Sequence, residues 1–520
     1  MTQLKNLTRR EFLGASAAGL GALAFKPRIP GGPADGGRPN ILFILTDDQR
    51  YDTMGCAGNR IIRTPNVDAL AREGVRFDRA FVTTPICAAS RASLLTGTFE
   101  RTHTYTFTKP PLAGTFTAIS YPVLLRKAGY RTGFVGKFGL AVEKGVEEEM
   151  FDFAKFTNLP HVQTIGGVER HMTEVEGEYA VEFLRGVKAD QPFCLTWCPW
   201  APHADDGDPK QYFWPPAVDG LYRNLGIPVP EMAAPAYYEA QPDFLKNTMS
   251  RTRWAWRFDT PEKYQAMVKG YYRMISGIDL VLGRIRAELE RLGLARNTIV
   301  LYSSDNGYFL GERGYADKWL MYDLSTNVPL VIYDPRSPRE ERGQVRRELT
   351  LNIDLPATLL DFAGSKVPAA IQGRSLRPLM GRTKPAWRRE IFCEELWDHP
   401  EIPQSECVRT DRWKYIQYPK HPDYVELFDL ENDPQEKHNL ARQARYGATL
   451  EDLRARCGRW IRDLVEARKK FQPPSRDSTD ISPLRNSEFP ASGTGAPTPA
   501  VQETPRAKVR GASVTADGMR

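Results

Sequence analysis

Five short, continuously apolar runs are the feature that most limits what this chain can fold into. Their residues do not alternate between apolar and polar, so each run predicts a strand buried on both faces. Longer stretches with apolar residues at helical spacing separate the runs, most clearly at residues 262–293. This alternation predicts a doubly wound α/β domain built on parallel strands. The runs are NILFIL (40–45), RTGFVG (131–136), FCLTWC (193–198), NTIVLYSS (297–304) and VPLVIY (328–333).

The length of the chain and a change in the length of its apolar runs indicate that the 520 residues form a main domain and a smaller one. We predict the main domain at residues 39–384. From residue 385 the apolar runs shorten and turns separate them, which predicts a C-terminal subdomain at residues 385–471 with a small antiparallel sheet and one helix. Residues 26–38 are rich in Pro and Gly and are predicted to be a linker. Residues 472–520 contain few large apolar side chains and are predicted to be a disordered tail.

The first 25 residues resemble an export signal. TRREFL at residues 8–13 is similar to a twin-arginine motif, and Ala22-Leu23-Ala24 offers a cleavage site between small residues. An amphipathic N-terminal helix is the alternative. No other segment approaches roughly 18 consecutive apolar residues. We therefore predict an export signal at residues 1–25. The protein would be periplasmic or secreted, would meet the twin-arginine translocation machinery and would make no integral membrane contact.

Charge and cysteine content exclude two classes of site. The formal net charge is +7, but the basic residues are scattered rather than clustered, so nucleic-acid binding is not predicted. The seven cysteines include no CxxC pair, which argues against structural zinc. Cys194 and Cys198 would lie about 13 Å apart along a strand, which is too far for a mutual disulfide. The pairing of the other cysteines stays open.

Polar side chains follow four of the apolar runs where each predicted strand ends. In an open parallel sheet these carboxyl ends meet in one crevice, where ligands bind. Carboxylate and amide oxygens suit calcium or magnesium, and crowded carboxylates would repel one another without a cation. Taken singly, each acidic pair has an alternative as a helix cap or a β-turn. The residues are Asp47 and Asp48, Lys137, His203, and Asp305 and Asn306.

A lone cysteine, Cys87, lies between a proline turn and a predicted helix start, with Arg91 four residues later. The stretch CAASRASLLTG resembles the signature of the type I sulfatases, in which the cysteine is oxidised to Cα-formylglycine. Further segments resemble sulfatases in the same order, from PNILFILTDDQR through SSDNGYFLGERG to ELFDLENDPQEKHNLA. The similarity covers roughly residues 39–442 and is nearest in motif to bacterial N-acetylglucosamine-6-sulfatases.

The resemblance implies a fold, a reaction and a role for each site residue. The fold would be alkaline phosphatase-like, with a large mixed, mostly parallel sheet sandwiched by helices. The reaction would be hydrolysis of sulfate esters on a sulfated carbohydrate, after a formylglycine-generating maturation enzyme has modified Cys87. Calcium would be held by Asp47, Asp48, Asp305, Asn306 and residue 87. Arg91 would orient the aldehyde hydrate, and Lys137, His203 and Lys318 would bind sulfate oxygens. Asp305 would take a proton from the attacking hydroxyl, and His203 or Lys318 would support the leaving alcohol.

Two positions depart from the family pattern. Gly139 stands two residues after Lys137, where many sulfatases have a histidine, and Ala89 replaces the commoner proline of the signature. A phosphonate monoester or phosphodiester hydrolase of the same superfamily is one alternative. A non-catalytic exported glycan-binding protein, in which Cys87 is never oxidised, is another. The aromatic-rich stretch 212–256 is predicted either to wall the substrate pocket or to pack over the sheet.

Overall fold

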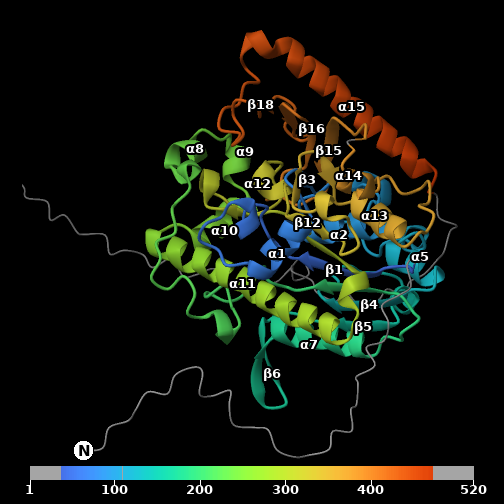
Figure 1. Cartoon of the computed structure of the whole chain (residues 1–520). Coiled ribbons are helices and arrows are strands. Elements are labelled where there is room, and N and C mark those ends of the chain that lie inside the picture. The colour runs from blue at the N-terminus through green and yellow to red at the C-terminus, as the bar shows by residue number, and fades with distance from the viewer. Residues whose placement is uncertain (1–36, 108, 384, 472–520) are drawn as a thin grey trace, which may run out of the picture. The chain divides into compact units, whose positions relative to one another are not determined.

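The computed structural model describes residues 37–471 except 108 and 384, so the predicted signal, most of the linker and the tail lie outside the described residues. An eight-stranded sheet organises the main domain (Figure 1). Its strands, in spatial order, are β13 (Gln344–Arg346), β2 (Val75–Phe77), β12 (Leu330–Tyr333), β9 (Thr298–Ser304), β1 (Asn40–Thr46), β8 (Phe193–Cys198), β4 (Arg131–Gly136) and β5 (Phe153–Phe156).

The centre of the sheet is parallel, as the apolar runs predict. β1 pairs in parallel with β8 and β9, and β4 pairs in parallel with β8 and β5. Every residue of β1, β8 and β9 is buried, which explains their unbroken apolar pattern. The run at 328–333 was expected to be parallel, and this is wrong, because β12 runs antiparallel to both β9 and β2. An apolar run reports burial but not strand direction.

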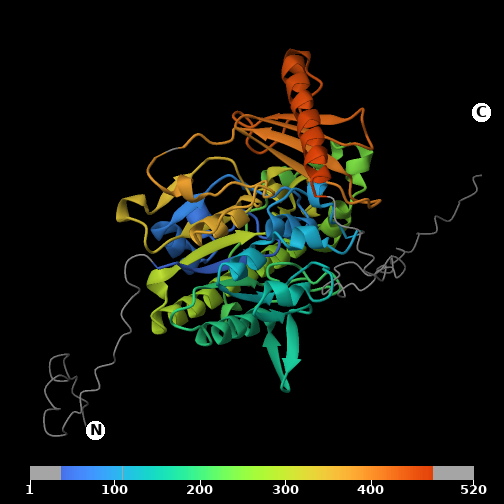
Figure 2. The ribbon, with the colours of Figure 1, turned by 90° about the vertical axis from the view of Figure 1, so that its right-hand side faces the viewer.

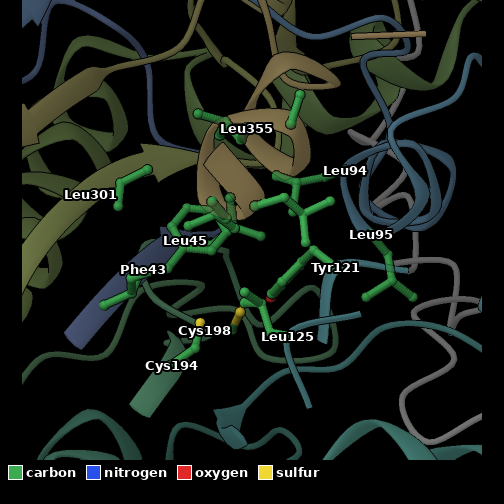
Figure 3. Packing of buried hydrophobic residues seen from close by; sticks show 14 of the residues in the cluster. Phe43, Leu45, Leu94, Leu95, Tyr121, Leu125, Cys194, Cys198, Leu301 and Leu355 are labelled. Atoms are coloured by element: carbon green, nitrogen blue, oxygen red, sulfur yellow. The ribbon is translucent and has the colours of Figure 1, made fainter. Parts of the chain in front are cut away.

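Helices cover both faces of the sheet, and β1 divides the two cores. Ile41, Phe43 and Leu45 point to one face, where α2 (Cys87–Thr96), α5 (Tyr121–Lys127) and α13 (Asp354–Phe362) pack. Figure 3 shows this core, with Tyr121 close to the sulfur-bearing side chains of β8. Leu42 and Ile44 point to the other face, against α1 (Pro65–Glu73), α7 (Met172–Arg185) and α11 (Pro261–Arg291).

Helix α11 confirms the longest predicted helix almost to the residue. It begins at Pro261, and the side chain of Thr260 accepts a hydrogen bond from the Lys263 amide as an N-cap. No described helix combines the length and the apolar character needed to cross a bilayer. No disulfide joins any of the seven cysteines, all of which belong to the described residues.

A separate antiparallel sheet forms the C-terminal part of the described chain, as the expected fold class requires. Its strands are β15 (Glu390–Glu395), β16 (Ser405–Thr410), β17 (Trp413–Gln417) and β18 (Val425–Asp429), in that spatial order. Helix α15 (Gly447–Lys469) packs against β16 and β17 (Figure 2). The sequence did not reveal β16, because its SECVRT stretch mixes polar and apolar residues.

Candidate active site

Four adjacent strands deliver polar residues to one end of the sheet. β9, β1, β8 and β4 are neighbours in the sheet order, and the chain leaves each one directly into a predicted site residue or the loop that carries it. The structure brings all nine predicted residues into one buried region, each at most 3% exposed. They are Asp47, Asp48, Cys87, Arg91, Lys137, His203, Asp305, Asn306 and Lys318.

Cys87 is the first residue of helix α2, where unpaired backbone amides favour an anion. The preceding residue, Ile86, is extended and is the N-cap, so the proline turn does end at a helix start as predicted. One turn into the helix, the Ser90 hydroxyl donates to the carbonyl of Asp305 at 2.5 Å. This contact ties the start of α2 to the end of β9.

Arg91 joins three of the strand ends. Its Nε donates to Asp305 Oδ2 at 2.8 Å and its Nη1 donates to the Lys137 carbonyl at 2.6 Å. Its Nη2 also lies 3.5 Å from Asp47 Oδ2. The guanidinium is therefore held in one orientation beside residue 87. Burial alone would lower the pKa of Arg91, but Asp305 and Asp47 raise it and keep the side chain charged.

The carboxylates and lysines are interleaved rather than segregated. Lys137 Nζ lies 2.6 Å from Asp47 Oδ2, and Lys318 Nζ lies 2.6 Å from Asp48 Oδ1. His203 Nε2 lies 3.6 Å from Asp48 Oδ2. Burial by itself would raise the pKa of Asp47, but Lys137, His203 and Arg91 outweigh it and lower that pKa. Burial raises the pKa of Asp305, which lies next to two other carboxylates.

The donor set fits a hard divalent cation. Asp47 Oδ1 and Asn306 Oδ1 are buried and accept no hydrogen bond from the described residues, an arrangement that is costly unless something else binds them. One ligand atom from each of Asp47, Asp48 and His203 falls within 4.8 Å of the others. The side-chain nitrogen of Asn306 also donates to Asp48 Oδ1. This bond points the side-chain oxygen of Asn306 away from Asp48. Oxygen donors of this kind suit calcium or magnesium.

Charge counting supports the same conclusion. The three aspartates are balanced by Arg91, Lys137 and Lys318, so the cluster is close to neutral when His203 is neutral. A divalent cation would leave two positive charges in excess. The cluster would then have the charge that an anionic ligand requires.

Gly139 is not an empty position left by a lost histidine. Its φ of +70° lies in the left-handed region, and a Cβ there would lie 2.9 Å from Arg91 Cδ and 3.6 Å from Lys137 Cε. The Arg91 side chain occupies this space. A side chain at 139 would therefore have to displace Arg91 or the backbone.

Several supporting residues were not predicted from the sequence. Asp317 and Trp319 flank Lys318 with φ values of +74° and +80°, and the Asp317 carboxylate accepts from Arg253 at 2.7 Å and from Arg257 at 2.9 Å. Both arginines belong to α10 (Met249–Arg257), which forms the end of the aromatic-rich stretch. The last part of that stretch therefore contacts and supports the loop that carries Lys318.

A second group of unpredicted residues supports Lys137 and His203. The Lys137 ammonium lies 4.2 Å from the centroid of the Trp200 ring, and the Trp200 ring meets that of His203 edge-on at 6.0 Å. His161 Nε2 is 2.8 Å from the His203 carbonyl. The position of Trp200, three residues before His203, was the only sequence signal for this contact.

The comparisons with known proteins agree with this geometry. Residues 39–365 match the family profile described as Sulfatase, and residues 311–462 match the profile described as N-sulphoglucosamine sulphohydrolase, C-terminal. The chain is 28% identical to an N-acetylglucosamine-6-O-sulfatase of Bacteroides thetaiotaomicron, over 85% of this chain and 88% of that protein. It is 27% identical to an arylsulfatase of Clostridium perfringens, over 80% and 93% of the two chains.

Solved structures share the fold. A protein solved with its substrate, D-glucosamine-2-N,6-O-disulfate, aligns with a TM-score of 0.67 and 25% identity, over 83% of this chain and 98% of that chain. A phosphonate monoester hydrolase of Agrobacterium radiobacter aligns with a TM-score of 0.63 and 22% identity, over 84% and 96% of the two chains. The second likeness concerns the fold alone.

Proposed function

The chain belongs to the sulfatase family and hydrolyses sulfate esters, and on that premise we propose that its substrate is a sulfated sugar bearing glucosamine. The relatives support this choice, because one acts on N-acetylglucosamine 6-O-sulfate by its name and another was solved with a disulfated glucosamine. The geometric observation that supports the sulfate-ester chemistry is a buried cluster of three carboxylates and three fixed cations, with Cys87 at the start of the helix that carries Arg91.

We propose that Cys87 is oxidised to formylglycine and that the site binds calcium. Hydrated formylglycine would supply one hydroxyl that attacks sulfur and a second whose deprotonation expels the bound sulfate. Calcium would supply Lewis acidity toward a sulfate oxygen, and its proposed ligands, besides residue 87, are Asp47, Asp48, Asp305 and Asn306. The two buried oxygens that lack donors, Asp47 Oδ1 and Asn306 Oδ1, support this assignment.

The chain's own cations are assigned to the sulfate and to the leaving alcohol. Lys137 and Lys318 are buried and held close to the carboxylates, so their charges act in a low-dielectric site, where they stabilise an anion most strongly. Arg91 fixes the orientation of residue 87 through its bonds to Asp305 and the Lys137 carbonyl. His203 is the proposed proton donor to the leaving oxygen.

Export through the twin-arginine route is part of the same proposal, with a periplasmic or secreted location and a cytoplasmic maturation enzyme. Arg9 and Arg10 support it. Replacing both by lysine should leave the protein in the cytoplasm, which fractionation would detect. Unchanged export would contradict the proposed signal.

Two measurements test the chemistry directly. Intact mass of the peptide containing residue 87 should show conversion of the thiol to the aldehyde or its hydrate. Rates on sulfated glucosamine, an aryl sulfate and a phosphodiester should then rank in that order. An unmodified thiol in active enzyme would refute the nucleophile. Phosphodiester turnover above sulfate turnover would favour the phosphonate monoester hydrolase alternative.

A further inference from the structure

The loop between β15 and β16, residues 396–404, crosses from the small C-terminal sheet to residue 87. Trp397 and Ile402 from this loop share one buried cluster with Ile86, Cys87 and Trp319. Trp397 is only 4% exposed. The cluster forms an apolar wall on residue 87, whereas Lys137, His203 and Lys318 pair with the carboxylates of Asp47 and Asp48.

Buried carboxylates fix this loop to the segment that leads into Cys87. Glu100 Oε2 accepts from the Thr84 hydroxyl at 3.1 Å and from the Leu396 amide at 3.3 Å. Glu395 Oε1 accepts from the Trp397 amide at 3.0 Å. The loop that carries Trp397 and the loop that carries residue 87 are therefore held by one side chain, Glu100, which is fully buried.

The far end of loop 396–404 is also anchored. The Met249 amide at the start of α10 donates to the Glu401 carbonyl at 2.9 Å, and Gln404 Nε2 donates to the Leu396 carbonyl at 2.8 Å. Both ends of the loop are fixed by hydrogen bonds, so the position of Trp397 next to residue 87 is fixed as well.

Aromatic rings continue from the buried site toward the surface. The Trp397 ring lies 5.1 Å from that of Phe107 and 4.6 Å from that of His399, measured between centroids. His399 is partly exposed, and its neighbours Asp398 and Pro400 are exposed. These ring contacts connect the buried cluster at residue 87 to the partly exposed His399, and flat apolar faces of this kind suit the C–H faces of a sugar ring.

Trp319 adds a hydrogen-bond donor at the same wall. The residue is only 1% exposed, and its buried Nε1 donates no hydrogen bond to any described residue. A buried N–H without an acceptor is costly unless a ligand supplies one. The strained backbone at Trp319 and the bond from its amide to the Pro85 carbonyl at 3.1 Å hold the residue in place beside Lys318.

We propose that Trp397 and Trp319 bind the sugar that carries the sulfate, Trp397 through its ring face and Trp319 through its indole N–H, with the remainder of the sugar directed along Phe107 and His399. This inference rests on the proposed function, because it needs a sulfated sugar as substrate. In this proposal the loop of the C-terminal sheet helps to recognise the sugar that becomes the leaving alcohol, and the main domain recognises the sulfate group.

The test separates recognition of the sugar from recognition of the sulfate. In W397L, kcat/KM for glucosamine 6-sulfate should fall by about tenfold or more, mostly through KM, because truncating a buried anchor commonly costs that much. Inhibition by inorganic sulfate should not change, because its cations are untouched. W397F should keep most of the activity. W319F, which keeps a ring but removes the N–H, should raise KM without altering sulfate inhibition.

Trp413 provides the matched control, since it lies on β17 of the same small sheet and packs against Tyr446. W413L should leave both readouts unchanged. Two results would overturn this inference alone, provided that the wild type is active. One is W397L with unaltered kinetics, and the other is W397L that loses affinity for the sugar substrate and for inorganic sulfate to the same extent. A wild type that turns over no sulfated sugar would overturn the proposed substrate together with it.

Discussion

Two buried charge clusters in this chain differ in how completely their charged and polar groups are paired. The docking cluster, made of Asp323, Arg409, Lys414 and Glu436, fastens the small sheet to the main domain. Lys414 Nζ lies 2.8 Å from Asp323 Oδ1 and 2.6 Å from Glu436 Oε1, and Arg409 Nη2 lies 3.1 Å from Asp323 Oδ2. The Glu436 carboxylate also accepts from the Asp323 amide at 2.8 Å.

The active-site cluster has a similar balance of fixed charges but leaves Asp47 Oδ1 and Asn306 Oδ1 without donors. The docking cluster has two acids and two bases that neutralise one another, so it needs no ligand. The difference separates structural pairing from functional pairing. Breaking the docking cluster should cost stability, whereas altering the active-site cluster should cost activity.

Cys87→Ala should give the largest effect on the functional side of this comparison. Removal of a nucleophile commonly costs about 10⁴-fold or more in kcat. Cys87→Ala removes a single heavy atom, so the melting temperature should change little compared with kcat. Steady-state kinetics and thermal unfolding of the same preparation would test both statements. Substantial residual sulfatase activity would contradict the assignment of residue 87.

Removal of divalent cations should come next. Chelation should abolish activity, calcium should restore it, and an ion present at about 100 times its dissociation constant should add about 2.7 kcal/mol of stability. Asp47→Asn should weaken this calcium-dependent stabilisation, measured by thermal unfolding across a calcium titration. Lys414→Met should retain it. Equal loss of the calcium response in both variants would erase the distinction between the two clusters.

Lys414→Met should give the largest effect on the structural side. It leaves the buried Glu436 carboxylate without its cation and Asp323 with Arg409 alone, and should cost about 3 kcal/mol in the free energy of unfolding. The fraction that stays folded should keep its kcat. Urea denaturation provides the measurement, and Lys420→Met is the control, because Lys420 and Asp398 form an exposed pair. A stable Lys414→Met protein with low kcat would reverse the expected pattern.

Glu176 extends the comparison to a buried carboxyl that pairs with no cation among the described residues. Within that part of the chain it accepts hydrogen bonds from Thr157 at 2.7 Å and, weakly, from Trp197 at 3.5 Å, and burial raises the pKa of Glu176 from 4.5 to about 8. Because the pKa of Glu176 is higher in the folded chain than in the unfolded chain, its contribution to stability is complete at pH values below the unfolded pKa of 4.5. Stability should therefore fall by about 1.4 kcal/mol per pH unit as pH rises through this window.

Glu176→Gln removes that titration. Unfolding measured at several pH values between 4.5 and 8 should show a shallower loss of stability with rising pH in the variant than in the wild type. Parallel curves for the two proteins would mean that Glu176 does not titrate in this range.

The sequence was most informative where local pattern and chemistry coincide. Asp47 and Asp305 follow fully buried strands directly, so the edge at which they meet could be predicted before the fold was known. Cys87 could be placed at a helix start from its proline turn. The roles assigned to these residues remain predictions, but their convergence follows from parallel strands ending on the same side of one sheet.

Contacts between distant segments could not be predicted in this way. Arg253 and Asp317 are 64 positions apart, and nothing local marks them as partners. The sequence shows that Gly139 stands where many sulfatases have a histidine, but it could not show that Arg91 packs against this position. The antiparallel direction of β12 was missed because burial on both faces gives the same apolar pattern for either direction.

The burial of Cys87 has a consequence for biosynthesis. A thiol that is 2% exposed, covered by Trp397 and Trp319, cannot enter the catalytic pocket of a second protein once the chain has folded. If residue 87 is converted to an aldehyde, the conversion must reach the nascent or unfolded chain, before loop 396–404 closes. The speed of folding then limits how much of the protein is matured, and slower closure would yield a larger modified fraction.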